Sequence, residues 1–208
     1  MSEPFLRRYT ELPALIHMLR TRQITLLDPQ TWDDRNDSHY LSLYKQKKSL
    51  KTVLALCFTA CSETYHHWRV FAHGTSGVCI RLNRPAVLKA LRTHGSIRTG
   101  KVKYLTLKQI RDRHLTVREL PFLKRAAFEP EEEYRVIFES ATTANPTRNV
   151  SLPLSAIHRI TLSPWLHPAL SPDVKKIIKS IPGCSGLEVV RSTLIGNTEW
   201  KNLGDSAA

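Results

Sequence analysis

The stretch PFLKRAAFEPEEEYRVIFES, Pro121–Ser140, decides how the rest of the chain is interpreted. A basic, amphipathic lead-in ends at Phe128. Three glutamates then run into an apolar segment with the aromatic and β-branched content of a strand. Because strand side chains alternate between faces, a strand that begins near Glu131 places four residues on one face: Glu131, Glu133, Arg135 and Ile137. The opposite face is apolar and can bury against a core.

The charged face of this strand has two interpretations. Glu131 and Glu133 repel each other, which raises the pKa of at least one of them, while Arg135 opposes that increase and keeps them charged. A charged row of this kind suits a cationic ligand or a cationic transition state. The competing interpretation is an acidic turn followed by a surface Arg–Glu ladder. Spacing alone favours this second interpretation, because charge runs usually lie in solvent.

Length and composition are those of an ordinary globular protein. The chain has 208 residues, 41% of them hydrophobic and 24% charged, which predicts one domain over residues 1–195 and a loose tail over 196–208. No run is long and apolar enough to span a membrane, and MSEPFLRRYTELP lacks the pattern of a signal peptide. We therefore expect a cytoplasmic protein with reduced cysteines.

Net charge points to a polyanionic partner. Lysine and arginine number 31 against 18 aspartates and glutamates, a formal charge of +13. This excess favours nucleic acid, an acidic protein or a phosphate-bearing cofactor. Because the basic residues are spread along the chain, charge alone does not establish nucleic-acid binding.

Short strands alternate with helices of two or three turns. The pattern predicts strands over Phe5–Tyr9, Gln23–Leu27, Thr52–Thr59, Val78–Leu82, Ile97–Leu105, Val150–Leu152, Ile157–Leu162 and Leu187–Arg191. It predicts helices over Glu11–Arg20, Tyr40–Lys48, Glu63–Ala72, Asn83–Arg92, Thr106–Leu115 and Asp173–Ser180. Several hairpin-like returns favour an α+β fold with a mixed, mostly antiparallel sheet over a regular parallel series.

The sequence contains two groups of candidate metal ligands, and we expect no metal cofactor. Three aspartates follow Trp32 (Asp33, Asp34 and Asp37) and could hold a divalent cation, but their spacing does not match a calcium loop. The only Cys/His group comprises Cys57, Cys61, His66, His67 and His73, and its spacings are not those of a structural zinc site.

The block Cys57–Leu82 carries hydroxyls at a strand end and aromatic residues in the following helix. Thr59 and Ser62, backed by Tyr65, Trp68 and Phe71, would form a shelf on which a planar ring could stack. The alternative is that Trp68 and Phe71 are core residues.

Four segments, in order, resemble a bacterial family catalogued as domain of unknown function twenty-nine seventy-one. They are Arg8-Tyr9-Thr10; Trp32-Asp33-Asp34-Arg35-Asn36-Asp37; Cys57-Phe58-Thr59 through Trp68, Phe71-Ala72 and Gly77-Val78-Cys79-Ile80; and Lys124…Phe128-x-x-Glu131-x-Glu133-Tyr134-Arg135. The chain departs from the family pattern in its DDRND loop, in Thr59 for the usual serine and in Phe71 for the usual tyrosine.

The layout of that family resembles ADP-ribosyltransferases, which carry an early Arg or His, a hydroxyl-bearing strand and a late glutamate, often in an E-x-E pair. The resemblance implies NAD as substrate and Glu133 as the carboxylate that stabilises an oxocarbenium ion, with Glu131 orienting or deprotonating the acceptor. It places Arg8 on the pyrophosphate. It further implies a cofactor-binding set of Tyr9, Thr59, Ser62, Trp68, Phe71 and Arg135.

The leading hypothesis is therefore an enzyme that transfers ADP-ribose from NAD to a macromolecule, preferably nucleic acid, in phage defence or as a toxin with a partner protein. A second hypothesis is a non-enzymatic nucleic-acid-binding or antitoxin-like module that binds through the helices Tyr40–Lys48 and Thr106–Leu115. A third is a metal-dependent nuclease that uses Asp33, Asp34, Asp37 and Glu131.

Overall fold

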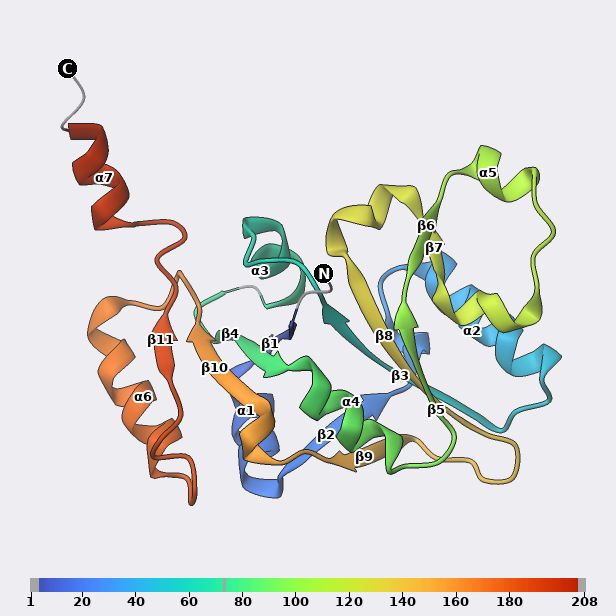
Figure 1. Ribbon diagram of the computed structural model, residues 1–208, viewed down its shortest axis with the longest axis horizontal. Helices are drawn as coiled ribbons and strands as arrows, with labels where there is room; N and C mark the ends of the chain where they lie inside the picture. Colours follow the sequence, from blue (N-terminus) through green and yellow to red (C-terminus); the bar gives the residue numbers. More distant parts are fainter. Residues whose placement is uncertain (1–3, 73, 206–208) are drawn as a thin grey trace. The chain divides into compact units, whose positions relative to one another are not determined.

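The computed structural model describes residues 4–72 and 74–205 and has short helices and mostly antiparallel strands (Figure 1). This confirms the predicted α+β class. The chain divides into two compact units. Unit 1 comprises residues up to Leu6, Arg22–Cys61 and Asn83–Pro153, and unit 2 comprises Arg7–Thr21, Ser62–Leu82 and the residues from Leu154. That residues 1–195 act as a single domain stays a prediction.

Unit 1 is built on strands in the order β9-β2-β3-β8-β5, and every neighbouring pair is antiparallel. Their bounds are β2 Gln23–Leu27, β3 Thr52–Thr59, β5 Ile97–Lys101, β8 Glu133–Ser140 and β9 Thr147–Ser151. The continuous apolar run TVLALCFT makes β3 the predicted buried strand, with the predicted bounds. The β3–β8 register pairs Thr59 with Glu133 and Cys57 with Arg135, so these four side chains share one face.

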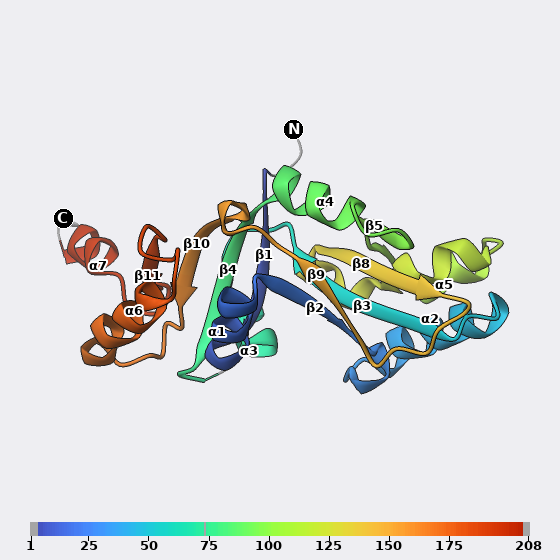
Figure 2. The same cartoon turned by 90° about the horizontal axis from the view of Figure 1, so that it is seen from below.

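Helix α2, Arg35–Lys47, covers that face of β3 and β8 (Figure 2). Its buried residues Leu41 and Tyr44 pack with Val53, Ala55 and Ile137 in one hydrophobic cluster. The helix begins at Arg35 instead of the predicted Tyr40, because the Asp34 side chain accepts hydrogen bonds from the backbone N–H groups of its first turn. The N-terminus of α2 therefore lies at the charged end of β8.

The predicted strand Ile97–Leu105 is two strands. β5 follows β8 until Lys101, and the Val102 N–H donates to the Glu133 carbonyl at 2.9 Å, where β8 begins. Beyond that point β8 offers no further partner, and β6, Lys103–Leu105, instead pairs in parallel with β7, Leu123–Arg125. The remaining helices of unit 1 are η1 Pro29–Thr31, α4 Arg84–Arg92, α5 Leu107–Arg111, η2 Val117–Phe122 and η3 Ala126–Glu131, where η denotes a 3₁₀ helix.

Unit 2 has strands in the order β11-β10-β4-β1. Their bounds are β1 Phe5–Glu11, β4 Gly77–Asn83, β10 Ile157–Leu162 and β11 Val189–Arg191, and the helices are α1 Leu12–Thr21, α3 Tyr65–Phe71, η4 Leu154–Ala156, η5 Pro168–Leu170, α6 Ser171–Ser180 and α7 Thr198–Asp205. Helix α7 lies where the sequence predicted a loose tail. All of its residues are exposed. Within the described ranges, no helix combines the length and apolarity needed to cross a membrane.

Candidate active site

The two candidate glutamates are separated by a left-handed residue. Glu131 is the last residue of η3, Glu132 has φ 43° and ψ 49°, and β8 begins at Glu133. The Glu132 side chain is exposed, and its carbonyl accepts a hydrogen bond from the Ala60 N–H at 3.0 Å. The sequence correctly placed Glu133, Arg135 and Ile137 on one strand face. Glu131 lies outside the strand, so the pleat of β8 does not fix the direction of its side chain.

Arg135 is fully buried and uses all five of its N–H donors within unit 1. Its Nε and Nη2 donate to the two carboxylate oxygens of Glu133 at 2.6 and 2.8 Å. Its Nη1 and Nη2 donate to the two oxygens of Asp37 at 2.7 and 2.6 Å, and Nη1 also donates to the Pro121 carbonyl at 2.9 Å. The guanidinium lies 5.1 Å from the centre of the Trp32 ring. Arg135 thus links Glu133 to Asp37 in the first turn of α2.

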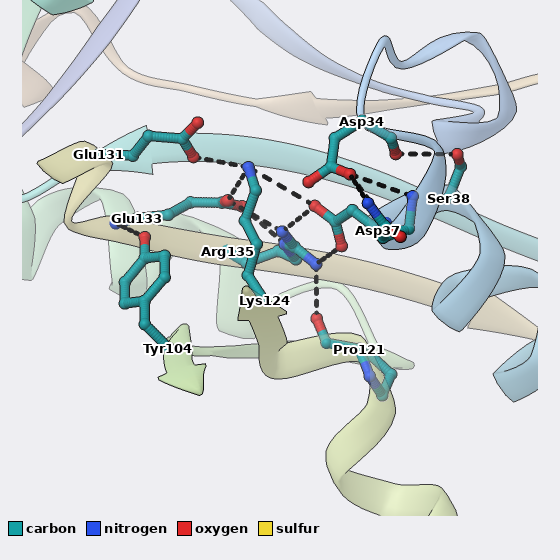
Figure 3. A network of polar contacts seen from close by, with 10 residues as sticks. Asp34, Asp37, Ser38, Tyr104, Pro121, Lys124, Glu131, Glu133 and Arg135 are labelled. Atoms are coloured by element: carbon teal, nitrogen blue, oxygen red, sulfur yellow. Dashed lines mark hydrogen bonds and ion pairs between the residues drawn. The ribbon is translucent and has the colours of Figure 1, made fainter. Parts of the chain in front are cut away.

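Lys124 on β7 supplies the second cation (Figure 3). Its Nζ lies 2.6 Å from Oε2 of Glu131, 3.6 Å from Oε2 of Glu133 and 3.8 Å from Oδ2 of Asp37. The lysine side chain is 8% exposed. One ammonium group therefore faces three carboxylates contributed by three different elements.

We call Asp37, Lys124, Glu131, Glu133 and Arg135 the glutamate cluster. Glu131 and Glu133 are each 5% exposed, and the Asp37 side chain is fully covered. The interpretation of this segment as a surface Arg–Glu ladder is therefore wrong, because the charged face of β8 is covered by α2 and β7. With every member ionised, three carboxylates oppose two cations, and the cluster carries a formal charge of −1.

The two glutamates have opposite pKa shifts. Burial would raise the pKa of Glu133, but the Arg135 guanidinium outweighs burial, and the pKa lies below its ordinary value. Burial raises the pKa of Glu131 above its ordinary value, and Lys124 cancels only part of that increase. Glu133 therefore stays ionised at neutral pH, whereas Glu131 is the more easily protonated of the pair. Burial raises the pKa of Asp37 as well, against the pull of Arg135.

Three further side chains border the cluster. The Tyr104 hydroxyl accepts a hydrogen bond from the Glu133 N–H at 2.8 Å, and burial raises the pKa of this tyrosine. The Cys57 thiol is hydrogen-bonded to the Glu133 carboxylate, and burial together with that negative charge raises the pKa of the thiol. Thr59, which pairs with Glu133 across the sheet, has its hydroxyl 3.2 Å from the Cys61 sulfur and accepts from the Cys61 N–H. Thr59 thus lies opposite Glu133 in the sheet, and that its hydroxyl binds the glutamate or the ribose stays a prediction.

The aspartate-rich loop caps the N-terminus of α2 and supplies an acidic residue to its first turn. One oxygen of Asp34 accepts from the backbone of Asn36 and Asp37 at 3.0 and 3.4 Å, and Asp37 binds Arg135. Among the residues that the structure describes, no group of three or more His, Cys, Asp and Glu side chains could hold a metal ion. His73 of the predicted Cys/His group lies outside the described residues. One hollow of unit 1, about 330 Å³, is lined by other residues, among them Leu41, Lys45 and Val53.

Five predicted cofactor-binding residues belong to unit 2. Tyr9 is buried, stacks on His67 with ring centres 5.3 Å apart and meets the edge of Trp68 at 5.1 Å. Trp68 is fully buried and donates to Glu63, so it is a core residue, the alternative that the sequence left open. Phe71 is 41% exposed, Ser62 is exposed and Arg8 is partly exposed on β1. Their contacts with a cofactor stay predictions.

The sequence did not predict Lys124 and Tyr104 as neighbours of the glutamates, and it grouped Asp37 with Glu131 only in the nuclease hypothesis. Lys124 and Asp37 do lie inside two of the four quoted segments, Lys124…Arg135 and Trp32…Asp37. The structure brings these two segments together through the Asp37–Arg135 pair, which spans 98 positions of sequence. Their joint appearance in the resemblance was the signal that could have identified the contact.

No family model matches the chain, and no curated protein matches it, so the resemblance to family twenty-nine seventy-one stays a prediction. Among solved structures, DarT of Thermus sp. 2.9 in complex with NAD+ is 12% identical, with 91% of this chain and 96% of that chain covered and a TM-score of 0.48. DarT in complex with ADP-ribosylated ssDNA is 13% identical, with coverages of 92% and 98% and a TM-score of 0.46. DarT in complex with carba-NAD+ is 12% identical, with coverages of 91% and 96% and a TM-score of 0.46.

Proposed function

We propose that this chain is an ADP-ribosyltransferase that transfers ADP-ribose from NAD to a macromolecular acceptor, with nucleic acid as the preferred class. The observation that supports it is the buried pair of glutamates that flank Glu132, with Glu133 held by two hydrogen bonds from Arg135 and Glu131 bonded to Lys124 at 2.6 Å. These environments shift the pKa values of the two glutamates in opposite directions. Two neighbouring carboxylates with separated pKa values are the arrangement that assigns one fixed charge and one proton acceptor.

Each glutamate then has a defined task. The bond between the ribose C1′ and the nicotinamide nitrogen breaks, and the electron pair leaves with nicotinamide. The ionised Glu133, held by Arg135, stabilises the positive charge that develops on the ribose. The acceptor atom forms its bond to C1′ and loses its proton to Glu131, whose raised pKa brings it closer to the range of a general base.

Arg135 acts in this scheme as a positioning residue. The sequence placed it in the cofactor-binding set, but its five donors are already engaged by Glu133, Asp37 and Pro121. Its effect on NAD would therefore pass through the orientation and charge of Glu133. The NAD contacts of Arg8, Tyr9, Ser62, Trp68 and Phe71 are part of the proposal and are tested by single substitutions, as is the role of Thr59.

Nucleic acid is proposed as acceptor because of the formal charge of +13. A toxin or phage-defence role in the cytoplasm, with a partner protein that restrains it, would fit an enzyme of this kind. The DarT structures contain NAD+ and ADP-ribosylated ssDNA, so NAD+ and unmodified single-stranded DNA are suitable first probes for the assay.

The test is release of nicotinamide from NAD by the purified chain, with no acceptor, with single-stranded DNA and with RNA. Glu133→Gln should lower the rate by about 100-fold or more, the loss expected when one preorganised electrostatic group is removed. Glu132→Gln is the matched control, because it is the same substitution one residue away on an exposed side chain. Absence of release with all acceptors from a folded protein, or equal rates for the two variants, would contradict the proposal.

The second candidate function is non-enzymatic binding of nucleic acid. It is favoured by exposed cations on the segment from β5 to η2: Lys101, Lys103, Lys108, Arg111 and Arg118. In that case Glu133→Gln leaves DNA affinity unchanged, whereas the pair Lys108→Ala and Arg111→Ala weakens binding and reduces its salt dependence. Titration of labelled single-stranded DNA at several salt concentrations distinguishes these outcomes.

A further inference from the structure

Lys124 is the cation that neither the strand pattern nor the proposed chemistry explains. It lies on the three-residue strand β7, where it pairs with Tyr104 of β6, and its side chain is 8% exposed. A lysine this deeply buried is normally retained only where its charge is matched by partners. Here the ammonium group has three of them, at 2.6, 3.6 and 3.8 Å.

This lysine bonds directly to the carboxylate of Glu131. Glu133 is held by its strand and by two hydrogen bonds from Arg135. Glu131 follows the turn of η3 and is separated from β8 by the left-handed Glu132. The bond of 2.6 Å from Lys124 Nζ holds the Glu131 carboxylate on the side of the same ammonium group that lies 3.6 Å from the carboxylate of Glu133.

We propose that Lys124 is the positioning residue of the glutamate pair, which holds Glu131 beside Glu133 and keeps Glu131 in its proton-accepting form. As far as catalysis is concerned, this rests on the proposed transferase function, because Lys124 would act on the reaction through Glu131. Its effect on the ionisation of Glu131 is independent of any activity.

The charge count gives the direction of the effect. With Lys124 present, three carboxylates face two cations; without it, they face Arg135 alone. Arg135 gives its five donors to Glu133, Asp37 and Pro121 and none to Glu131, so loss of Lys124 removes the cation of the cluster that is bonded to Glu131. The groups that face Glu131 and Lys124 include Glu133 and Arg135 from β8, Asp37 from α2, Tyr104 from β6 and Cys57 from β3, with the Phe128 ring 4.8 Å from the ammonium group. Loss of the ammonium group therefore favours protonation of Glu131.

The variant that tests this is Lys124→Met, compared with Lys124→Arg, which keeps the charge. Lys103→Met is the matched control, since Lys103 lies on the partner strand β6 and is exposed. The readout in the enzyme is the pH dependence of kcat for nicotinamide release. In Lys124→Met the acid limb should move up by at least about one pH unit, so the loss of kcat is larger on the acid side than at about pH 8 and approaches roughly tenfold at pH values below both midpoints. A loss equal at every pH would mean a purely structural role and would overturn the proposal.

A second measurement does not require turnover. The side-chain carboxyl of Glu131, labelled with ¹³C and assigned with Glu131→Gln, is titrated by NMR. Its midpoint should rise by at least about one pH unit in Lys124→Met and stay unchanged in Lys103→Met. If Lys124→Met does not fold, Lys124→Gln, which also lacks the charge, takes its place.

The two measurements separate the two proposals. A shifted Glu131 midpoint in a protein that releases no nicotinamide would refute the transferase function and leave the Lys124–Glu131 coupling standing. An unshifted midpoint would refute the role of Lys124, whatever the enzyme activity.

Discussion

Replacing Arg135 by methionine should lower the free energy of unfolding by about 3–5 kcal/mol at about pH 8. The Arg135 side chain is fully buried and donates five hydrogen bonds, four of them to carboxylates. Methionine is flexible and fills much of the same apolar volume, so the loss comes from electrostatics more than from a cavity. Without the guanidinium, Asp37 and Glu133 stay buried, with the Lys124 ammonium 3.8 and 3.6 Å away.

The loss of unfolding free energy in Arg135→Met should depend on pH in a defined direction. In the native protein the folded-state pKa of Glu133 is lowered, so its contribution is present above the unfolded pKa and is lost as pH falls through the folded pKa. In Arg135→Met the same carboxyl is buried without its cation, its folded-state pKa is raised, and protonation relieves the penalty. The difference between the two proteins is therefore largest near about pH 8 and narrows toward about pH 5.

Urea unfolding followed by circular dichroism measures this difference, and a thermal scan should show a midpoint lower by about 6–20 °C, at about 2–4 °C per kcal/mol for a chain of this size. The control is Arg113→Met, which breaks the Arg113–Glu119 pair at 2.5 Å, whose side chains are 31% and 26% exposed. That pair should contribute less than about 1 kcal/mol. Equal losses for the two variants, or a loss for Arg135→Met that does not shrink as pH falls, would refute the electrostatic account of the cluster.

Three further outcomes follow from local geometry. Gly77→Ala should destabilise by about 1–3 kcal/mol or more in urea unfolding, because its Cβ would lie 2.1 Å from the Ala72 carbonyl oxygen, whereas Gly186→Ala, with open space, should not. Asp34→Ala should cost about 1 kcal/mol through loss of the α2 cap, and Asp34→Asn, which keeps an acceptor, much less. Glu131→Gln should reduce nicotinamide release but leave the free energy of unfolding at about pH 8 equal or higher. The folded-state pKa of Glu131 is raised, so this carboxyl costs stability as pH rises. The free energies of unfolding of Glu131→Gln and the native protein should therefore converge at low pH. A clear loss of stability at high pH would show that Glu131 is needed by the fold.

Much of the fold could be predicted from local pattern, and the cluster could not. The continuous apolar run placed β3, and alternation placed Glu133 and Arg135 on one face of β8. Alternation tells which side chains share a face but not what covers that face, so the same pattern also fitted a solvent-exposed ladder. The charged face of β8 is covered by α2 and β7. Helix α2 reaches it through the Asp37–Arg135 contact, which spans 98 positions of sequence, and β7 is too short to have a periodic signal.

Stability alone does not explain the composition of the glutamate cluster. Burying ions is costly, and well-packed apolar residues would often serve the fold as well or better. Asp37, Lys124, Glu133 and Arg135 at least form a balanced set of two acids and two bases, in which each acid lies within salt-bridge distance of a cation. Glu131 breaks that balance. Its pKa is raised by burial and Lys124 does not fully compensate, so this carboxylate makes the cluster less stable at neutral pH than the balanced set would be. Packing and charge balance therefore account for four members, and Glu131 is the member whose presence calls for a chemical role.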